Sequence, residues 1–486
     1  MDSNNIVIKY LKSLGYNPST DYYSYIKLWK SWYEGLVPSI HNYYDQNKEQ
    51  RTIDRLGMAK RVCEDWASIL YTERDGIVCE NENNQKFIEK WFAEDKLDFN
   101  NNIPDNIETA FWSGTVGTIV KAVNVNIVNK KIQATSDTSF TMVNVNASQI
   151  IPLRIIDGKI VDVAFVSKDI IDNKKVFYIE IHTLKKDGYT IQNKYIDELG
   201  AEVKNDNVVE EFETDSKTPL FALLSPKIVN NISSNNGLGI SVYANAIDQL
   251  KAVDIVYNNF VKDFYLGGKK VFYNKKLTKY ETITYTDEET GETVTQDIPI
   301  YPDDITKQQF QIIGDEADIV DSDTLIHEHN PDLRETDNEN GNNFALNMLA
   351  FKTGLGKSYY KMEQNGVVTA TQAILDNKDL VGNAKKHRAS VNKYTVAITK
   401  AVLMLGRILL KEPVSEEDNI KLVDKDGYLV SEEDQKEEFR EEISMGLRSK
   451  TSYLMTFYGM SEEEALREIE LINQEDQISF KQPSVE

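Results

Sequence analysis

Apolar residues recur at two different spacings along the chain. Through the first hundred residues they recur every three or four positions, as in 6–14 and 56–69, which predicts amphipathic helices. From about 118 to 209 they alternate with polar residues, as in 177–181, and turn pairs such as Asp157-Gly158 separate the alternating runs. This part of the chain therefore predicts an antiparallel β region behind a helical start.

The second half is predicted to be helical around one small β insertion. A loop rich in Asn, Ser and Gly at 230–239 precedes a predicted helix at 240–265, and a further helix is expected at about 333–353. Between these helices, strands are expected at 281–286, 293–298 and 310–313. The order of elements indicates an α+β protein of several domains.

A Gly-rich loop at 354–366 follows the second of these helices. It carries Gly354, Gly356 and Gly366, so its ends are expected to act as hinges. Thr369 and Gln372 then have the spacing of a capping box, which predicts a long helix toward Lys411, roughly 60 Å at 1.5 Å per residue. Its apolar stripe is Val391, Tyr394, Ile398, Ala401, Val402, Leu405 and Leu409.

The residues after 410 carry 21 acidic and 9 basic side chains and predict an acidic helical tail. Its last two helices are expected to be hinged at Gly459, and Ser461-Glu462-Glu463-Glu464 has the spacing of a second capping box.

Charge and composition exclude several classes of protein. The chain has 486 residues, with 55 Lys and Arg against 78 Asp and Glu, and a net charge of −23. A protein that coats DNA or RNA should be basic, because phosphate neutralisation supplies most of its affinity. Two cysteines, Cys63 and Cys79, are too few for a disulfide framework and favour a reducing compartment. No stretch has the apolar length of a membrane span or a signal peptide.

Two basic features stand out in this acidic chain. Lys269, Lys270, Lys275, Lys276 and Lys279 lie close together, and 380–411 carries seven Lys or Arg and no acid. Each is interpreted either as a solvated face that pairs with acidic neighbours or as a local contact with a polyanion.

No motif assigns a catalytic residue, a metal or a cofactor. Gly356-Lys357-Ser358 resembles the end of a phosphate-binding loop, but Phe351 stands where the first glycine of that motif belongs. His327 and His329 share one face of a predicted strand, yet no third ligand stands nearby in sequence. The chain is therefore expected not to be an enzyme.

The order of helix, small β module, helix, Gly-rich loop, long helix and acidic tail resembles that of tailed-bacteriophage portal proteins, of the type in siphophages of Gram-positive hosts. Gln372 departs from the Glu expected at the start of the long helix. The strings that carry the resemblance are Trp29-Lys30-Ser31-Trp32-Tyr33-Glu34-Gly35, Met58-Ala59-Lys60-Arg61-Val62-Cys63-Glu64-Asp65-Trp66-Ala67, Pro219-Leu220-Phe221, Gly237-Leu238-Gly239-Ile240-Ser241, Asp248 to Asp254, Asn330-Pro331-Asp332-Leu333-Arg334, Val368-Thr369-Ala370-Thr371-Gln372, Met445-Gly446-Leu447-Arg448-Ser449 and Ser461-Glu462-Glu463-Glu464-Ala465.

The resemblance implies a multidomain portal fold with a wing, a helical stem, a small β clip and a helical crown. The implied boundaries are 1–239 for the wing, 240–265 and 333–353 for the stem helices, 266–332 for the clip, 354–368 for a tunnel loop, 369–410 for the long wing and crown helix, and 411–486 for the acidic crown.

The resemblance also implies a function and partners. The chain would form a ring of about twelve copies at one capsid vertex. Double-stranded DNA would pass through its channel during packaging and ejection. Terminase, head-completion or adaptor proteins, the major capsid protein and scaffolding proteins would be its partners. It would be found in the virion and, during assembly, in the host cytoplasm, with no membrane partner and no cofactor.

Two sets of residues are the implied contact sites. The DNA-facing tunnel loop would present Lys357, Ser358, Tyr359, Tyr360, Lys361, Gln364 and Asn365. The clip would dock partners through Lys269, Lys270, Asp287, Glu288, Glu289 and Glu292.

Two other classes of protein stay open. One is a cytosolic enzyme whose site lies in the β region, and the other is a non-viral acidic scaffold. Formation of a ring would separate the portal hypothesis from both.

Overall fold

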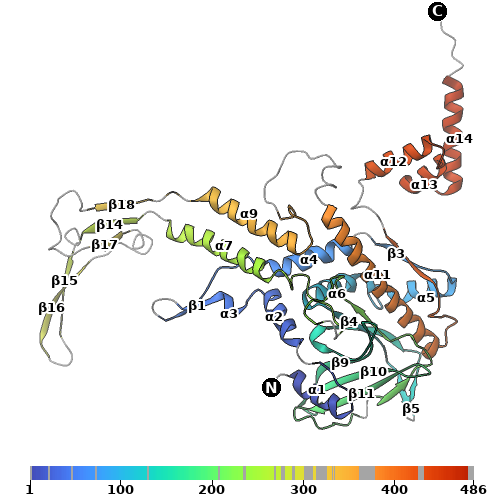
Figure 1. Ribbon diagram of the computed structural model, residues 1–486, viewed down its shortest axis with the longest axis horizontal. Helices are drawn as coiled ribbons and strands as arrows, with labels where there is room; N and C mark the ends of the chain where they lie inside the picture. The colour runs from blue at the N-terminus through green and yellow to red at the C-terminus, as the bar shows by residue number, and fades with distance from the viewer. Residues whose placement is uncertain are drawn as a thin grey trace, which may run out of the picture. The chain divides into compact units, whose positions relative to one another are not determined.

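A computed structural model shows a mixed helix and sheet protein, which confirms the α+β prediction (Figure 1). It divides into two compact units. Unit 1 is Met1–Leu36, Ala59–Ala246 and Ala350–Glu486, and unit 2 is Val37–Met58 and Ile247–Leu349. The structure describes residues 3–19, 22–44, 48–71, 74–128, 131–205, 208–233, 237–267, 270–274, 280–286, 291–299, 310–313, 326–330, 332, 334–360, 378–424 and 432–479.

Unit 1 contains most of the helices. They are α1 (Ser3–Ser13), α2 (Tyr23–Tyr33), α4 (Met58–Tyr71), α5 (Glu82–Phe92), α6 (Phe99–Ser113), the short turn η1 (Ala147–Gln149), α11 (Lys378–Leu405), the π-helical turn η5 (Gly406–Leu410), α12 (Glu432–Ser444), α13 (Lys450–Tyr458) and α14 (Glu462–Ser479). The expected helices at 6–14 and 56–69 are confirmed as α1 and α4, and Gly15 ends the first at a φ of 89°.

Two antiparallel sheets form the β region of unit 1. One has the strand order β12-β11-β10-β9-β8 and the other β13-β4-β7, which confirms the antiparallel prediction. The strands are β4 (Val116–Val123), β7 (Ser139–Asn146), β8 (Ile150–Ile156), β9 (Lys159–Ile171), β10 (Lys174–Leu184), β11 (Tyr189–Asp197), β12 (Glu211–Glu213) and β13 (Phe221–Leu224). The small pairs β5–β6 (Asn126–Val128, Lys131–Gln133) and β3–β19 (Arg74–Cys79, Ile420–Asp424) complete it.

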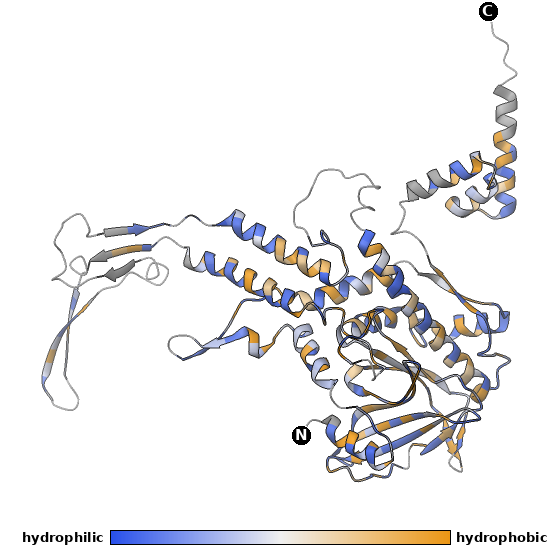
Figure 2. Ribbon diagram, in the orientation of Figure 1, coloured by the Kyte–Doolittle hydropathy of each residue, from blue (hydrophilic) through white to orange (hydrophobic). Residues whose placement is uncertain are grey.

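Helix α1 covers one face of the five-stranded sheet. Its Val7, Ile8 and Leu11 are buried in one cluster with strand residues such as Ile179 and Ile181. Figure 2 shows hydrophobic and hydrophilic positions mixed along α1, as its amphipathic pattern requires. The apolar residues that repeat every 3.6 positions in α1 and every two positions in the strands therefore pack into one core.

The apolar stripe predicted for the long helix is buried from Val391 to Leu409, as expected. The helix itself ends in a different way. After Leu405 the chain makes a π-helical turn, and Lys411 stops it in the left-handed conformation at a φ of 55°. The predicted capping box at Thr369–Gln372 lies outside the described residues.

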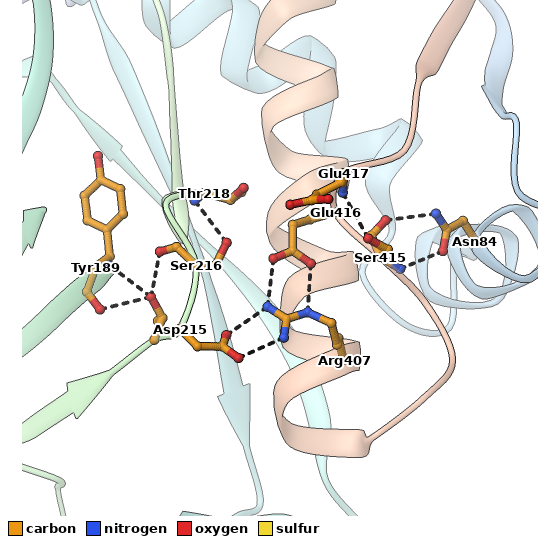
Figure 3. Close-up of polar contacts among 10 residues, drawn as sticks. Asn84, Tyr189, Asp215, Ser216, Thr218, Arg407, Ser415, Glu416 and Glu417 are labelled. Atoms are coloured by element: carbon orange, nitrogen blue, oxygen red, sulfur yellow. Dashed lines mark hydrogen bonds and ion pairs between the residues drawn. The ribbon is translucent and has the colours of Figure 1, made fainter. Parts of the chain in front are cut away.

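Arg407 explains part of the basic run at 380–411. Its guanidinium donates to both carboxylate oxygens of Asp215, at 2.8 and 3.0 Å, and to both of Glu416, at 2.8 and 2.9 Å (Figure 3). Ser415 beside this pair exchanges hydrogen bonds with Asn84 of α5. At this position the pairing interpretation is correct, because the arginine holds the loop after β12 and the loop after η5 on the end of the long helix.

Unit 2 consists of a helix pair, a small β module and the excursion 37–58. Its elements are α3 (Pro38–His41), β1 (Asn42–Tyr44), β2 (Gln50–Thr52), α7 (Ile247–Leu266), β14 (Lys270–Asn274), β15 (Tyr280–Thr286), β16 (Thr293–Pro299), β17 (Phe310–Ile313), β18 (Ile326–His329) and α9 (Glu335–Lys352). The strands expected at 281–286, 293–298 and 310–313 are confirmed.

The helix predicted at 240–265 starts later than expected, at Ile247. The residues before it are held in a non-helical conformation by contacts with α6 and α2. Ser241 Oγ and the Val242 amide both donate to the carbonyl of Phe111, and Tyr243 donates to the carbonyl of Trp29. These tertiary hydrogen bonds outweigh the helical propensity of the segment.

Gly114 and Gly239 approach each other closely beside that segment. Gly114 has a φ of 88°, and a Cβ on it would lie 2.5 Å from the Gly239 carbonyl oxygen. The Gly239 amide donates to Thr115 Oγ1 at 2.9 Å. Only glycine fits at this backbone crossing.

We predict that Gly114→Ala lowers the free energy of unfolding by at least about 2 kcal/mol, because backbone overlap adds to the strain of a left-handed alanine. Gly158→Ala is the matched control. Its φ of 72° carries the same kind of strain, but nothing lies within 4 Å of the added Cβ. Urea unfolding of both variants checks this, and equal losses would contradict the steric argument.

Candidate functional site

The Gly-rich loop begins where α9 ends, in unit 1. Gly354 adopts a φ of 83°, and the Leu355 amide donates back to the Ala350 carbonyl at 2.9 Å, which closes the helix. Leu355 is fully buried. Asn383 of α11 donates its Nδ2 to the Gly354 carbonyl at 3.1 Å. The first end of the loop, where a hinge was predicted at Gly354, is therefore held by the helix end, the core and α11 together.

Trp66 of α4 fixes the residue just before this end. Its indole Nε1 donates to the Thr353 carbonyl at 3.1 Å, and its ring is fully buried. The ring also packs edge-on against His387 of α11, with 4.8 Å between the ring centroids. The loop thus leaves the core of unit 1 at Thr353, between α4 and α11.

His387 is buried as a neutral acceptor. Its Nδ1 accepts a hydrogen bond from the Lys227 amide at 2.9 Å. Burial, together with the nearby charge of Lys386, lowers the pKa of His387 to about 4. The neutral imidazole is consequently part of the folded structure at neutral pH.

The described part of the loop is held a second time at Tyr360. Its hydroxyl donates to Asp65 Oδ2 at 2.7 Å, and Arg61 lies 3.0 Å from the other carboxylate oxygen of Asp65. Burial raises the pKa of Asp65, although Tyr360 and Arg61 both act to lower it. Tyr360, one of the residues predicted to face DNA, directs its hydroxyl toward α4 through this hydrogen bond.

Lys357 and Ser358 are the exposed side chains between the two fixed points. The Lys357 ammonium lies 5.9 Å from the centre of the Phe351 ring, a weak cation–π contact. Tyr359 is half-buried and packs edge-on against Tyr360. The arrangement presents one ammonium and one hydroxyl, both donors to a phosphate. Lys361, Gln364 and Asn365 lie outside the described residues.

The predicted docking residues fall on the β module of unit 2. Lys270 begins β14, the central strand of a sheet with β17 and β18, and Glu292 is exposed just before β16. Strands β15 and β16 form a separate two-stranded ribbon whose described side chains are nearly all exposed. Lys269, Asp287, Glu288 and Glu289 lie outside the described residues, as do Lys275, Lys276 and Lys279.

A buried polar cluster that the sequence did not indicate lies in the β region. Lys121 of β4 pairs with Glu180 of β10, whose oxygens also accept from Tyr178 at 2.9 Å and contact His182 Nε2 at 2.9 Å. A cavity of about 240 Å³ adjoins Lys121, Tyr178 and Glu180. The only signal in the sequence is the pair of ionisable residues at alternate positions of an apolar strand.

This cluster is the place where an enzyme site in the β region would be sought. Burial raises the pKa of Glu180, but the hydrogen bond from His182 and the charge of Lys121 outweigh it and leave the pKa at about 2. The ammonium and the carboxylate therefore neutralise each other, and the cluster offers an enzyme no activated base or nucleophile.

The described residues include no group of three or more His, Cys, Asp or Glu side chains placed to hold a metal ion. His327 and His329 lie on β18, the strand predicted for them. None of the helices in the described ranges is long and apolar enough to cross a membrane.

Comparison with known proteins gives little at the sequence level. No family model and no curated protein matches the chain. Among solved structures, one described as the neck of a native GTA particle, computed with C12 symmetry, matches 82% of this chain and 89% of its own. The TM-score is 0.41 and the sequence identity is 8%, so this likeness decides neither family nor function.

We predict that Tyr360→Phe loosens the loop while leaving the fold intact. The variant removes the hydrogen bond from Tyr360 to Asp65, which is worth about 1 kcal/mol. Trypsin should cleave after Lys357 about fivefold faster in the variant. Ser358→Ala, which changes an exposed neighbour, is the control and should leave the rate unchanged. Equal cleavage of all three proteins would show that Tyr360 does not hold the loop.

We also predict that His387 makes stability depend on pH. Because its pKa is depressed in the folded state, the unfolded chain binds the proton first. The free energy of unfolding should therefore fall by up to about 3 kcal/mol between pH 6.5 and pH 4, with no contribution above pH 6.5. Urea unfolding of His387→Phe should lack this part of the slope. An identical slope in both proteins would contradict the assignment.

Proposed function

We propose that this chain is a portal protein of a tailed phage. It forms a ring of about twelve copies at one capsid vertex. Double-stranded DNA passes through the channel during packaging and ejection, and terminase and head-completion proteins dock on the ring. The chain has no catalysis of its own, and the motor supplies ATP turnover. It acts in the virion and, during assembly, in the host cytoplasm beside capsid and scaffolding proteins.

This proposal rests on the order of elements in the chain. The helices α7 and α9 are separated by a small β module, and a loop fixed at Gly354 and Tyr360 follows α9 directly. Arg334 lies 2.5 Å from Asp263, and Asn338 donates to Asp263 at 2.8 Å, so the start of α9 packs beside the end of α7. Figure 1 shows α7 and α9 side by side, with β14–β18 beyond one end of the pair. This order supports a stem, a clip and a tunnel loop.

The loop supports a transient contact with DNA. Lys357 and Ser358 are donors at an exposed tip, and the loop is fixed at Gly354 and Tyr360. A chain of net charge −23 repels phosphates elsewhere, so duplex DNA would slide without sticking. Lys357 and Lys361 of each copy would contact the DNA backbone weakly and reversibly, and salt would screen these contacts.

The β15–β16 ribbon supports docking of a partner. Its two strands pair only with each other among the described strands, so both outer edges keep unpaired amide and carbonyl groups. Such edges accept an added strand from another protein. A terminase or an adaptor is the partner that the portal proposal assigns to this surface.

Imaging of the purified protein together with DNA packaging tests the proposal. Negative-stain images should show closed rings. Lys357→Glu combined with Lys361→Glu should still form rings and procapsids but package or retain at least about tenfold less DNA, because repulsion replaces each phosphate contact. Lys174→Glu combined with Lys175→Glu makes the same charge change on exposed residues of β10 and should package normally.

A monomer under all conditions would overturn the portal proposal. If rings of the Lys357→Glu, Lys361→Glu variant package and hold full-length genomes, the proposal of a ring still stands. That result would show that this loop is not the DNA contact.

A further inference from the structure

A large groove of about 810 Å³ lies in unit 1, away from the Gly-rich loop. Helices α1 and α2, the turn η1 and the strands β9 and β10 enclose it. The lining residues are Asn5, Ile8, Tyr23, Ser24, Ile26, Lys27, Lys30, Ser148, Gln149, Val166, Ser167, Lys168 and Phe177. None of these lining residues is acidic, although acids outnumber bases in the whole chain.

The groove combines an apolar wall with positive charge. Ile8 and Ile26 are buried, while Lys27 and Lys30 lie three residues apart on α2 and therefore share a face. Lys30 pairs with Glu34 at 3.4 Å, whereas Lys27 and Lys168 form no ion pair with any described residue. A ligand for this groove should offer carboxylates beside apolar side chains, since bare phosphates would leave the apolar wall unused.

Helix α14 carries that combination. Ala465 is fully buried, and α14 packs on α13, but Leu466 and Leu471 are 50% and 55% exposed. Glu463 and Glu470 lie three residues before and four after Leu466, so the three side chains share one exposed face. Figure 2 shows hydrophobic positions among the hydrophilic ones on α13 and α14. No described residue covers this face.

We propose that the exposed face of α14 from one copy docks in the basic groove of a second copy. Residues 462–472 span about 16 Å as a helix, and they would set Leu466 on the apolar wall with Glu463 and Glu470 toward Lys27 and Lys168. The contact joins two different surfaces, so repeating it from copy to copy builds a ring when the rotation between copies closes. It rests on the homo-oligomer of the proposed function and adds a specific interface to it.

Carbodiimide cross-linking of two co-expressed variants tests whether the contact joins two chains. The first variant is Lys27→Glu with Lys168→Glu, which keeps α14 and loses the groove lysines. The second is Glu463→Lys with Glu470→Lys, which keeps the groove and loses the helix carboxylates. A peptide that links Lys27 or Lys168 to Glu463 or Glu470 can then come only from two different chains, and we expect it in the mixed oligomer by mass spectrometry.

Charge reversal supplies the second measurement. Each variant alone should weaken assembly at low salt about tenfold, because several exposed ion pairs together are worth roughly one order of magnitude in affinity. A chain that carries all four reversals should recover assembly, since the signs are exchanged on both sides. Lys9→Glu with Lys12→Glu changes exposed lysines of α1 that do not line the groove and should assemble normally.

The outcomes separate this inference from the proposed function. If the mixed oligomer forms rings without the inter-chain link, the docking of α14 is overturned and the portal proposal stands. The same conclusion follows if the lysine–glutamate link appears only in the wild-type protein, where one chain carries both the lysines and the carboxylates. Added duplex DNA or an acidic partner protein occupying the groove in place of α14 would overturn it as well. A chain that never forms oligomers would overturn both.

Discussion

The hydrogen bond from the Trp66 indole to the Thr353 carbonyl holds together parts of the chain that are far apart in sequence. Around it, α4 contributes the buried ring, Thr353 just after α9 the carbonyl, and α11 the edge of His387. A buried tryptophan needs a partner for its N–H, and here that partner is the carbonyl at the point where a helix ends. This contact fixes the residue just before the Gly-rich loop, and the bonds of Asn383 to Gly354 and of Tyr360 to Asp65 hold the loop itself.

Buried and exposed charged residues differ in how they are paired within this acidic chain. The buried carboxylates Glu416 and Glu180 are paired with Arg407 and Lys121, because an uncompensated charge in the core is costly. Where lysines are exposed at Lys357, Lys27 and Lys168, no described acid neutralises them. Such residues are available to ligands, since a ligand need not displace an internal partner to reach them.

The same distinction separates a binding surface from a catalytic site. Catalysis needs a group whose proton affinity is poised near the working pH. The Glu180 cluster does the opposite, because His182 and Lys121 lower the pKa of the carboxylate and hold it in its ionised form. The exposed lysines of the loop and the groove can attract anions and are suited to binding them.

Local pattern was sufficient to predict most helices and strands. The spacing of apolar residues identified α1, α4, the antiparallel strands and the buried stripe of α11, and Ser461 with Glu464 forms the expected capping box. These features depend on neighbours within a few residues, so the sequence contains the whole interaction. The composition likewise excluded a basic nucleic-acid coat without any knowledge of the fold.

Tertiary structure decided the features that depend on distant residues. The sequence predicts residues 240–246 as helix. In the structure, the backbone carbonyls of Phe111 and Trp29 accept hydrogen bonds that hold these residues in another conformation. The sequence predicts Tyr360 as an aromatic residue that faces DNA, but in the structure its hydroxyl binds Asp65. It likewise predicts a hinge at Gly354, whose carbonyl accepts a hydrogen bond from Asn383. In each case the partner lies at least 29 positions away, so no spacing along the chain could reveal it, and only the packed core brings the two groups together.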